Sequence, residues 1–184
     1  MAVDELSNRR GKARWLGGLG IAACLMIAHV PVARAQEGAI TADTLVERAK
    51  IEDLLTRYYY GLGHGSADSF SAFYADDAEL ILGPNSYRGK QGIADAYRSA
   101  GQDDSRRKAF AFTVTLSNPL VIVHGDTATA QLIFTEFIID TQGAAPRVLE
   151  QGREYDDLVK VNGQWCFKRR QILPGTQSPA GWTG

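Results

Sequence analysis

The chain has 184 residues, of which 45% are hydrophobic, and a formal net charge of −1. This length and composition indicate one ordinary globular domain, alone or with a removable end. Three histidines and two cysteines provide no zinc ligand set, and the sequence contains neither a glycine-rich phosphate loop nor a dinucleotide fingerprint, so we expect no metal and no cofactor.

Residues 1–35 have the pattern of a signal peptide. Arg9, Arg10, Lys12 and Arg14 form a basic start, the apolar run WLGGLGIAACLMIAHVPV follows, and Ala-Arg-Ala stands before Gln36. The apolar run is interrupted and ends at this cleavage pattern, which favours removal over a permanent membrane span. We therefore expect a periplasmic or secreted protein that begins near Gln36 and has no stable membrane span.

Two other export types stay open at this point. Ile21–Cys24 resembles a lipoprotein box, although apolar residues continue beyond the cysteine. The pair Arg9–Arg10 resembles a twin-arginine signal, although the residues that follow match that pattern poorly.

Removal of this segment changes the charge and the cysteine content. It takes five of the 20 basic and two of the 21 acidic residues, which leaves 15 against 19 and a net charge of about −4. Such a chain is not basic enough to suggest a nucleic-acid partner. Cys24 leaves with the segment, so Cys166 has no partner for an internal disulfide.

A long helix is predicted after a short linker over residues 36–42. Thr44 and Glu47 have the spacing of a capping box. Apolar residues then recur at helical spacing, namely Ile51, Leu54, Leu55, Tyr58, Tyr59 and Leu62. The pattern predicts a helix from about Asp43 to Leu62, with Tyr60 on the opposite side and exposed.

Short elements are predicted next. Ser66 is placed to cap a second, short helix that carries Phe70, Phe73 and Tyr74 inward. A strand at Ala78–Leu82 and a short strand around Tyr87 follow, and GKQGIADAYRSA then predicts a third helix.

Four long strands complete the predicted elements. They cover residues 109–125, 128–140, 147–161 and 164–173. Pro119 predicts a bulge or bend in the first of them. Asn162–Gly163 is a strong signal for a tight hairpin between the last two.

This order of elements predicts the fold class. Helices followed by long antiparallel strands indicate an α+β domain, in which three N-terminal helices pack into a strongly curved antiparallel sheet. Long sheets curl, so we expect a cone-shaped α+β barrel with a central cavity. The domain would cover residues 43–173, and residues 174–184 would form a flexible tail.

Several motifs together resemble a known family. They are IEDLLTRYYYGLGHGSADSFSAFYADDAEL, YRGKQGIADAY, SNPLVIVHGDTATA and GREYDDLVKVNGQWCFKRRQI. They resemble the SnoaL-like, scytalone-dehydratase-like branch of the nuclear transport factor 2-like superfamily, over about Asp43 to Leu173. The resemblance implies the cone-shaped fold. It leaves the activity open, because members include dehydratases, cyclases, isomerases, dehydrohalogenases, epoxide hydrolases and binding-only domains.

The resemblance transfers to some positions and not to others. Tyr58 matches the tyrosine at the end of the family's first helix, and Asp156 matches an aspartate on the third long strand. Gly63 replaces an aspartate, Val114 replaces a histidine, and Glu154 replaces a tyrosine. The resemblance therefore implies a member that lacks the usual His–Asp pair.

Side-chain alternation along the strands gives an independent assignment of the inward face. The inward series contain Phe112, Val114, Phe134, Glu136, Glu154 and Asp156. Glu136 lies in line with Phe134 and Ile138, so its carboxylate needs a partner or a raised pKa if it is buried. An ion pair with an arginine and a role in the pocket both stay open.

These patterns define a candidate site. The candidate catalytic residues are Tyr58, Glu136 and Asp156. The candidate ligand-binding residues are Leu55, Tyr74, Tyr97, Phe112, Val114, Phe134, Glu154 and Trp165. Phe73 is expected to bound the same cavity. His64 and His124 lie in predicted turns, so we expect both to be exposed.

Three functions are compatible with this site. The first is a cofactor-independent lyase, isomerase or hydrolase that acts on a small apolar or aromatic molecule, with Glu136 or Asp156 as the base and Tyr58 as a hydrogen-bond donor. The second is a binding domain for such a molecule without turnover. The third is a structural domain that self-associates. We also expect a homodimer, in which Arg153 points outward to the dimer surface.

The signal pattern predicts the mass of the exported protein. Expression with the full leader in a secreting bacterial host should give a mature chain that begins at Gln36, because Ala-Arg-Ala places the cleavage there. Intact-mass spectrometry of the exported fraction measures this. A lipid-modified chain beginning at Cys24, or a chain that retains residues 1–35, would contradict the prediction.

Overall fold

The helices and strands follow one another in the order predicted. The computed structural model describes residues 40–62, 64–103, 111–139, 141, 143–180 and 182. The side chains of Ala111 and Phe112 are not among the described parts. The predicted signal peptide and its cleavage site lie outside the described residues. None of the helices in these ranges is long and apolar enough to cross a membrane.

The first helix, α2, covers Ala42–Gly61. Its capping box is formed by Thr41 and Thr44, so the predicted pair of Thr44 and Glu47 is wrong by three residues. The Thr44 backbone N–H donates to the Thr41 hydroxyl, and the Thr41 backbone N–H donates to the Thr44 hydroxyl. Because Thr44 already closes the box, Glu47 is available for contacts outside the helix end.

The predicted apolar stripe of α2 faces the core. Ile51, Leu55, Tyr58 and Tyr59 are buried, whereas Tyr60 is 84% exposed. This confirms the helical period and the outward direction of Tyr60.

The short elements occur in the predicted order. They are α3 at Ala67–Ser71, β1 at Tyr74–Leu82, β2 at Asn85–Arg88 and α4 at Gly89–Ser99. The predicted short helix is shorter than expected: α3 ends before Phe73, and Tyr74 begins β1, which starts four residues before the predicted strand. Ser66 caps α3, because its hydroxyl accepts from the backbone N–H of Ser69. Helix α4 buries Ile93, Ala94, Ala96 and Tyr97.

The long strands are β3 at Ala111–His124, β4 at Thr127–Ile139, β5 at Arg147–Val161 and β6 at Gln164–Pro174. The register of β3 shifts between Ser117 and Leu120, at the predicted break around Pro119. Asn162 and Gly163 have φ values of 50° and 81°, which are the positive values that a tight two-residue hairpin requires.

The strands form one six-stranded sheet in the order β2-β1-β6-β5-β4-β3. Four of the neighbouring pairs are antiparallel, as predicted, but β1 and β6 run parallel, so the sheet is mixed. Hairpin signals predict pairing only between strands that are consecutive in the sequence. Strands β1 and β6 are far apart in the sequence, so no such signal predicts that they pair. The sheet ends at β2 and β3, so it is curved and open and does not close into a barrel.

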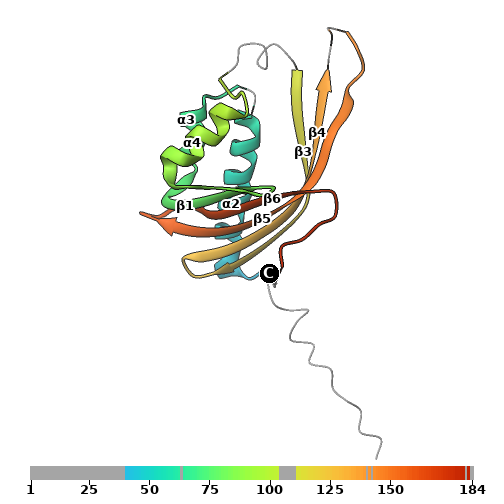
Figure 1. Cartoon of the computed structure of the whole chain (residues 1–184). Helices are drawn as coiled ribbons and strands as arrows, with labels where there is room; N and C mark the ends of the chain where they lie inside the picture. Colours follow the sequence, from blue (N-terminus) through green and yellow to red (C-terminus); the bar gives the residue numbers. More distant parts are fainter. Residues whose placement is uncertain are drawn as a thin grey trace, which may run out of the picture. The chain divides into compact units, whose positions relative to one another are not determined.

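The curved sheet encloses the helices (Figure 1). Helix α2 contacts β3 and β6, and α3 and α4 contact each other, with α4 against β1. One apolar core fills this space, and it includes side chains from all three helices and from β1, β3, β4, β5 and β6. The fold is therefore α+β, with the concave side of the sheet turned toward α2.

The segment after β6 contacts the outer side of β5. The Gly175 backbone N–H donates to the Gln151 carbonyl over 2.9 Å, and the Tyr155 hydroxyl donates to the Gln177 carbonyl over 3.0 Å. The Trp182 ring meets the Tyr155 ring edge-on at 5.1 Å between centroids. Tyr155 is consequently buried although it lies on the outward series of its strand.

Gly152 on β5 is predicted to be intolerant of even one added methyl group. A Cβ there would lie 2.5 Å from the Leu173 carbonyl oxygen and 2.5 Å from the ring of Phe134. We expect Gly152→Ala to lower the free energy of unfolding by about 1–3 kcal/mol, because β6 or the Phe134 ring must move. Urea denaturation measures the change.

Gly92→Ala in α4 is the matched control. Its added Cβ would meet only a backbone atom of Tyr87, at 3.9 Å. Alanine in a helix is favoured over glycine, so stability should stay constant or rise by up to about 1 kcal/mol. Equal effects of the two substitutions would contradict the close packing at Gly152.

Candidate functional site

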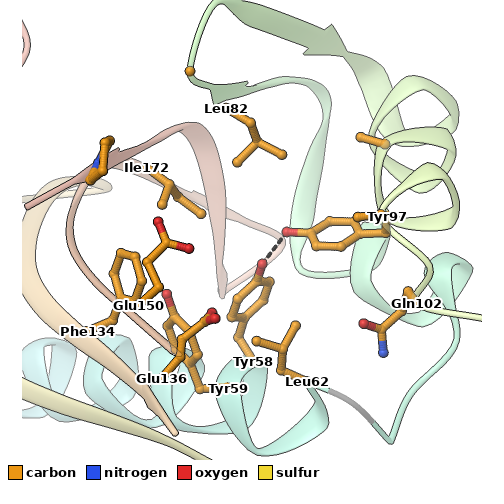
Figure 2. A pocket seen from close by; sticks show the side chains of 14 residues that line it. Tyr58, Tyr59, Leu62, Leu82, Tyr97, Gln102, Phe134, Glu136, Glu150 and Ile172 are labelled. Carbon is orange, nitrogen blue, oxygen red and sulfur yellow. Dashed lines mark hydrogen bonds between the residues drawn. The ribbon is translucent and has the colours of Figure 1, made fainter. Parts of the chain in front are cut away.

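A cavity of about 320 Å³ lies between α2, α4 and the concave side of the sheet (Figure 2). Most of its wall is aromatic or aliphatic, from Tyr58, Tyr59, Leu62, Leu82, Tyr97, Phe134 and Ile172. The polar side chains on the wall are those of Gln102, Glu136 and Glu150, together with the tyrosine hydroxyls. The cavity thus combines apolar surface with a few placed polar groups, as ligand sites commonly do.

Three tyrosine hydroxyls form a connected chain beside the cavity. The Tyr58 and Tyr97 hydroxyls are hydrogen-bonded (Figure 2), and the Tyr74 and Tyr97 hydroxyls are 3.0 Å apart. Burial raises the pKa of Tyr97, and it raises the pKa values of Tyr58 and Tyr74 well above the usual value. All three hydroxyls therefore stay neutral near pH 7 and can donate hydrogen bonds.

A fully buried charge cluster contacts Tyr58 and its neighbour Tyr59. Arg170 on β6 and Glu154 and Asp156 on β5 are each 0% exposed. The Arg170 guanidinium donates to the Glu154 carboxylate, and its Nε lies 3.6 Å from an Asp156 oxygen. It also donates to the Tyr59 hydroxyl over 3.3 Å.

Aromatic rings enclose the guanidinium. Its central carbon lies 3.9 Å from the centroid of the Tyr58 ring, 4.3 Å from that of Phe167 and 5.4 Å from that of Tyr59. These are cation–π distances. Tyr58 and Tyr59 thus line the cavity and also contact Arg170.

The cluster contains more negative groups than positive ones, and its protonation follows from that. Burial raises the pKa of Glu154 and raises that of Asp156 well above its usual value, with the Glu154 charge adding to the effect at Asp156. Burial alone would lower the pKa of Arg170, but Glu154 and Asp156 raise it well above the usual value. Arg170 therefore stays charged, and the pKa is raised further at Asp156 than at Glu154, which contacts the guanidinium directly.

Several polar atoms of this cluster have no hydrogen bond within the described part of the chain. They are both carboxylate oxygens of Asp156, Oε1 of Glu154, and Nε and Nη1 of Arg170. The same residue ranges contain no group of three or more His, Cys, Asp and Glu side chains arranged to hold a metal ion.

Two glutamates lie on the opposite wall of the cavity. Glu136 on β4 and Glu150 on β5 are direct partners in the antiparallel register, and both line the cavity. Figure 2 shows both carboxylates on the side where Tyr59 and Phe134 lie, across from Tyr97. The cavity therefore holds carboxylates that can accept a proton and neutral hydroxyls that can donate a hydrogen bond.

The structure brings part of the predicted site together. Tyr58, Tyr97, Phe134 and Glu136 line the cavity. Tyr74 reaches it through the Tyr97 hydroxyl. Glu154 and Asp156 point inward, as the strand alternation predicted, but they contact Arg170 behind the cavity wall.

Other predicted residues lie elsewhere. Leu55 is buried in the core beneath the cavity. The Trp165 indole N–H donates to Glu47 over 2.8 Å, and Trp165 shares a separate surface depression with Phe73. Leu55, Phe73 and Trp165 are therefore not among the residues that line the cavity, and Glu47 holds the Trp165 indole near the start of α2.

Two further predicted residues and the histidines complete the comparison. Val114 is half-buried and lines a groove between α2 and β3. The side chain of Phe112 is outside the described part. His64 and His124 are both exposed, as predicted.

Arg170 was the main residue that sequence reasoning missed. Strict alternation from Trp165 and Phe167 places Arg169 on the inward face of β6. The register of β5 and β6 contains a bulge. Asp157 pairs with Arg169 and Leu158 pairs with Phe167, so Lys168 of β6 has no partner residue on β5. The extra residue turns Arg170 inward, and two inward carboxylates on the neighbouring strand were the signal that a cation must face them.

The chain belongs to the SnoaL-like domain family, whose family model matches residues 43–171. This family contains small-molecule-binding domains and domains of the isomerase and dehydratase type. The comparison with curated protein sequences finds no significant match.

Several solved structures have the same fold. A candidate scytalone dehydratase from Novosphingobium aromaticivorans DSM 12444 is 24% identical, with a TM-score of 0.61, over 78% of this chain and 100% of that one. An NTF2-like protein with a cystatin-like fold from Novosphingobium aromaticivorans is 23% identical, with a TM-score of 0.61, over 84% and 95%. Aln2 from a Streptomyces species is 21% identical, with a TM-score of 0.62, over 71% and 91%. At these identities the likeness concerns the fold.

The buried cluster predicts how stability depends on pH. The pKa of Asp156 is raised in the folded protein above its unfolded value of about 3.9, so its stabilising contribution is complete below pH 4 and is lost as the pH rises. Asp156→Asn removes this titration. The free energy of unfolding of the variant, relative to that of the wild type, should therefore increase as the pH rises from 4 to 8. The increase is at most about 1.4 kcal/mol per pH unit.

Urea denaturation at each pH measures this difference. Asp157→Asn is the matched control, because Asp157 follows directly in β5 on the outward series, and its charge makes only the smallest contribution to the raised pKa of Asp156. Its profile should therefore differ from that of the wild type much less than the profile of Asp156→Asn does. A constant difference between wild type and Asp156→Asn across the range would mean that Asp156 stays ionised.

Proposed function

We propose that this domain binds a small apolar or aromatic molecule with a carbonyl or similar oxygen acceptor, and that it transfers a proton on that molecule without a cofactor. The observation that carries the proposal is the arrangement of the cavity wall. The neutral hydroxyls of Tyr58 and Tyr97 and the Glu136 carboxylate line one cavity whose wall is otherwise mainly apolar, and Figure 2 shows Tyr58 between Tyr97 and Glu136.

The cavity supports the binding part of the proposal. Its volume of about 320 Å³ is at the lower end of the usual range for ligand sites. Rings of Tyr58, Tyr59, Tyr97 and Phe134 provide flat apolar surface. An aromatic ligand of one or two rings fits these properties.

The polar groups support the chemical part. The Tyr58–Tyr97–Tyr74 chain uses two of its three hydroxyl protons internally, so a carbonyl oxygen held beside it would accept one hydrogen bond, which strengthens as negative charge develops on that oxygen. Glu136 would take the proton from the neighbouring carbon and return it to another position, or a β-substituent would leave. The first outcome is an isomerisation and the second an elimination.

Asp156 receives a different role from the one first predicted. Arg170, Tyr58 and Tyr59 stand between it and the cavity, so it does not meet the ligand. We assign Asp156 and Glu154 as positioning residues, which act on the cavity by holding the Arg170 guanidinium against the two tyrosine rings.

A binding-only domain is the second candidate. It is favoured by the replacement of the family histidine by Val114, which removes the usual base. Export to the periplasm or outside the cell and self-association as a homodimer are also proposals. Export is supported by the basic start, the apolar run and Ala-Arg-Ala before Gln36.

Acetophenone tests the proposal, because it combines one aromatic ring with a carbonyl that has exchangeable α-hydrogens. We expect ligand-detected NMR in D₂O to show binding to the domain and α-hydrogen exchange faster than in buffer. Tyr58→Phe should weaken binding about three- to tenfold, the value of one hydrogen bond. Glu136→Gln should leave binding within about twofold and abolish the excess exchange.

Matched controls separate the two parts. Ethylbenzene lacks the carbonyl, so its binding should not respond to Tyr58→Phe. Glu150→Gln changes the register partner of Glu136 and shows which carboxylate takes the proton. If the wild type and the variants bind acetophenone but none of them accelerates α-hydrogen exchange, the binding-only function remains. If the domain binds neither acetophenone nor ethylbenzene, the proposal is refuted.

A further inference from the structure

The carboxamide of Gln102 is a buried polar group in the wall of the central cavity. Gln102 is 1% exposed, and its side chain lines the cavity just beyond the end of α4. Both ends of a buried carboxamide usually have hydrogen-bond partners, because a buried polar atom without one is unfavourable. The partners of its nitrogen and its oxygen therefore indicate whether the protein alone satisfies this group.

A Schellman motif at the end of α4 places Gln102 at this point. Gly101 has a φ of 80°, the left-handed value that this motif requires after a helix. The Gly101 backbone N–H donates to the Arg98 carbonyl, and the Gln102 backbone N–H donates to the Tyr97 carbonyl, each over 3.0 Å. The position of Gln102 in this motif commonly has an apolar side chain, which packs against the last turn of the helix. Packing at the helix end therefore does not explain a carboxamide there.

One end of the carboxamide connects this segment to the turn after α2. The Gln102 Nε2 donates to the Gly65 carbonyl over 2.9 Å. The next residue, Asp103, accepts from the Ala67 backbone N–H over 3.0 Å. These bonds, together with the bond to the Tyr97 carbonyl, hold the carboxamide in one orientation.

The other end of the carboxamide faces the cavity. A carbonyl can only accept a hydrogen bond, so the bond to Gly65 identifies the nitrogen and leaves Oε1 on the other side. Figure 2 shows the oxygen directed toward Leu62 and Tyr58, with the nitrogen below it. No hydrogen bond to Oε1 is found among the residues that the structure describes. The wall therefore presents a fixed acceptor to the cavity.

The chemistry of this acceptor defines the group that it recognises. A neutral amide oxygen accepts from O–H and N–H groups, whereas it cannot bond another carbonyl or a carboxylate. The tyrosine hydroxyls on the same wall have the complementary property, because they can donate to a carbonyl oxygen. A ligand that satisfies both groups has an acceptor and a donor on one aromatic framework.

We propose that Gln102 is a specificity-determining residue of the central cavity, whose Oε1 accepts a hydrogen bond from a hydroxyl or amino group on the ring of the ligand. The ligand class is then an aromatic ketone that bears a hydrogen-bond donor. The proposal rests on the proposed function, because the carbonyl of the ligand is held beside the hydroxyls of Tyr58, Tyr97 and Tyr74. The carboxamide also holds Gly65, so contact with the ligand and support of the wall have to be distinguished by the choice of ligands.

A series of ketones on the wild-type protein tests the need for a donor. The ligands are acetophenone, its 3- and 4-hydroxy derivatives and the matching methoxy derivatives, at about pH 6, where the phenols are neutral. At least one hydroxy derivative should bind about three- to tenfold more tightly than acetophenone, the value of one hydrogen bond. Its methoxy counterpart cannot donate and should lose this gain. Isothermal titration or ligand-detected NMR gives the dissociation constants.

Substitution of Gln102 tests whether this residue is the acceptor. Gln102→Met keeps the length of the side chain and removes the amide oxygen. The affinity for the preferred hydroxy derivative should fall to within about twofold of that for acetophenone, which should itself change by less than about twofold. Gln102→Leu should give the same result. Gln91→Met is the matched control, because Gln91 is exposed on α4 and outside the cavity wall, and it should change neither affinity.

Three results would overturn this role of Gln102. The first is equal binding of acetophenone and both hydroxy derivatives by the wild type, and the second is an unchanged preference in Gln102→Met, which would place the acceptor elsewhere. The third is an equal loss for all ligands in both variants, which would mean that the carboxamide only supports the wall. Thermal denaturation shows whether the variants are folded, and the series on the wild type does not depend on them.

These results are distinct from failure of the proposed function. Binding of acetophenone to the wild type without a preference for a hydroxy derivative would overturn the role of Gln102 alone. Failure of the wild type to bind any of the ketones would refute both proposals.

Discussion

The burial of one positive charge constrains the rest of this structure. The Arg170 guanidinium is 0% exposed, and a charge in such a place is tolerated only where counterions and hydrogen-bond acceptors surround it. From the neighbouring strand, Glu154 contacts the guanidinium directly and Asp156 lies 3.6 Å from its Nε, and the rings of Tyr58 and Phe167 cover its faces. Removal of one partner from a buried ion pair commonly costs about 3–5 kcal/mol, so the sheet register and the position of α2 are specified together.

The same contacts shape the cavity. Tyr58 and Tyr59 must lie on the guanidinium side of α2, and this places their other sides in the cavity wall. The Tyr58 hydroxyl then meets that of Tyr97 from α4, which joins the two helices through a buried hydrogen bond. A change at Arg170 is thus transmitted to the cavity through side chains that touch both. Stability and the shape of the cavity depend on one set of contacts.

The sequence predicted those features that depend on a regular period. The inward direction of Phe134, Glu154 and Asp156 followed from alternation, and the buried stripe of α2 followed from helical spacing. It did not predict features that depend on one irregular residue or on contacts across the chain. The unpaired Lys168 turned Arg170 inward against the alternation, and the parallel pairing of β1 with β6 carries no local signal. The sequence therefore predicted where the cavity lies, but it did not predict the buried Arg170 beside it.

The position of Val114 connects the missing family histidine to the shape of the site. The resemblance places a histidine at this point of the first long strand, and this side chain lines the groove between α2 and β3. An isopropyl group there removes a proton acceptor from that groove. Glu136 is the direct partner of Val114 on β4, and its side chain lines the central cavity. Under the proposed function, the proton is therefore taken by a carboxylate on β4 and not by a histidine on β3.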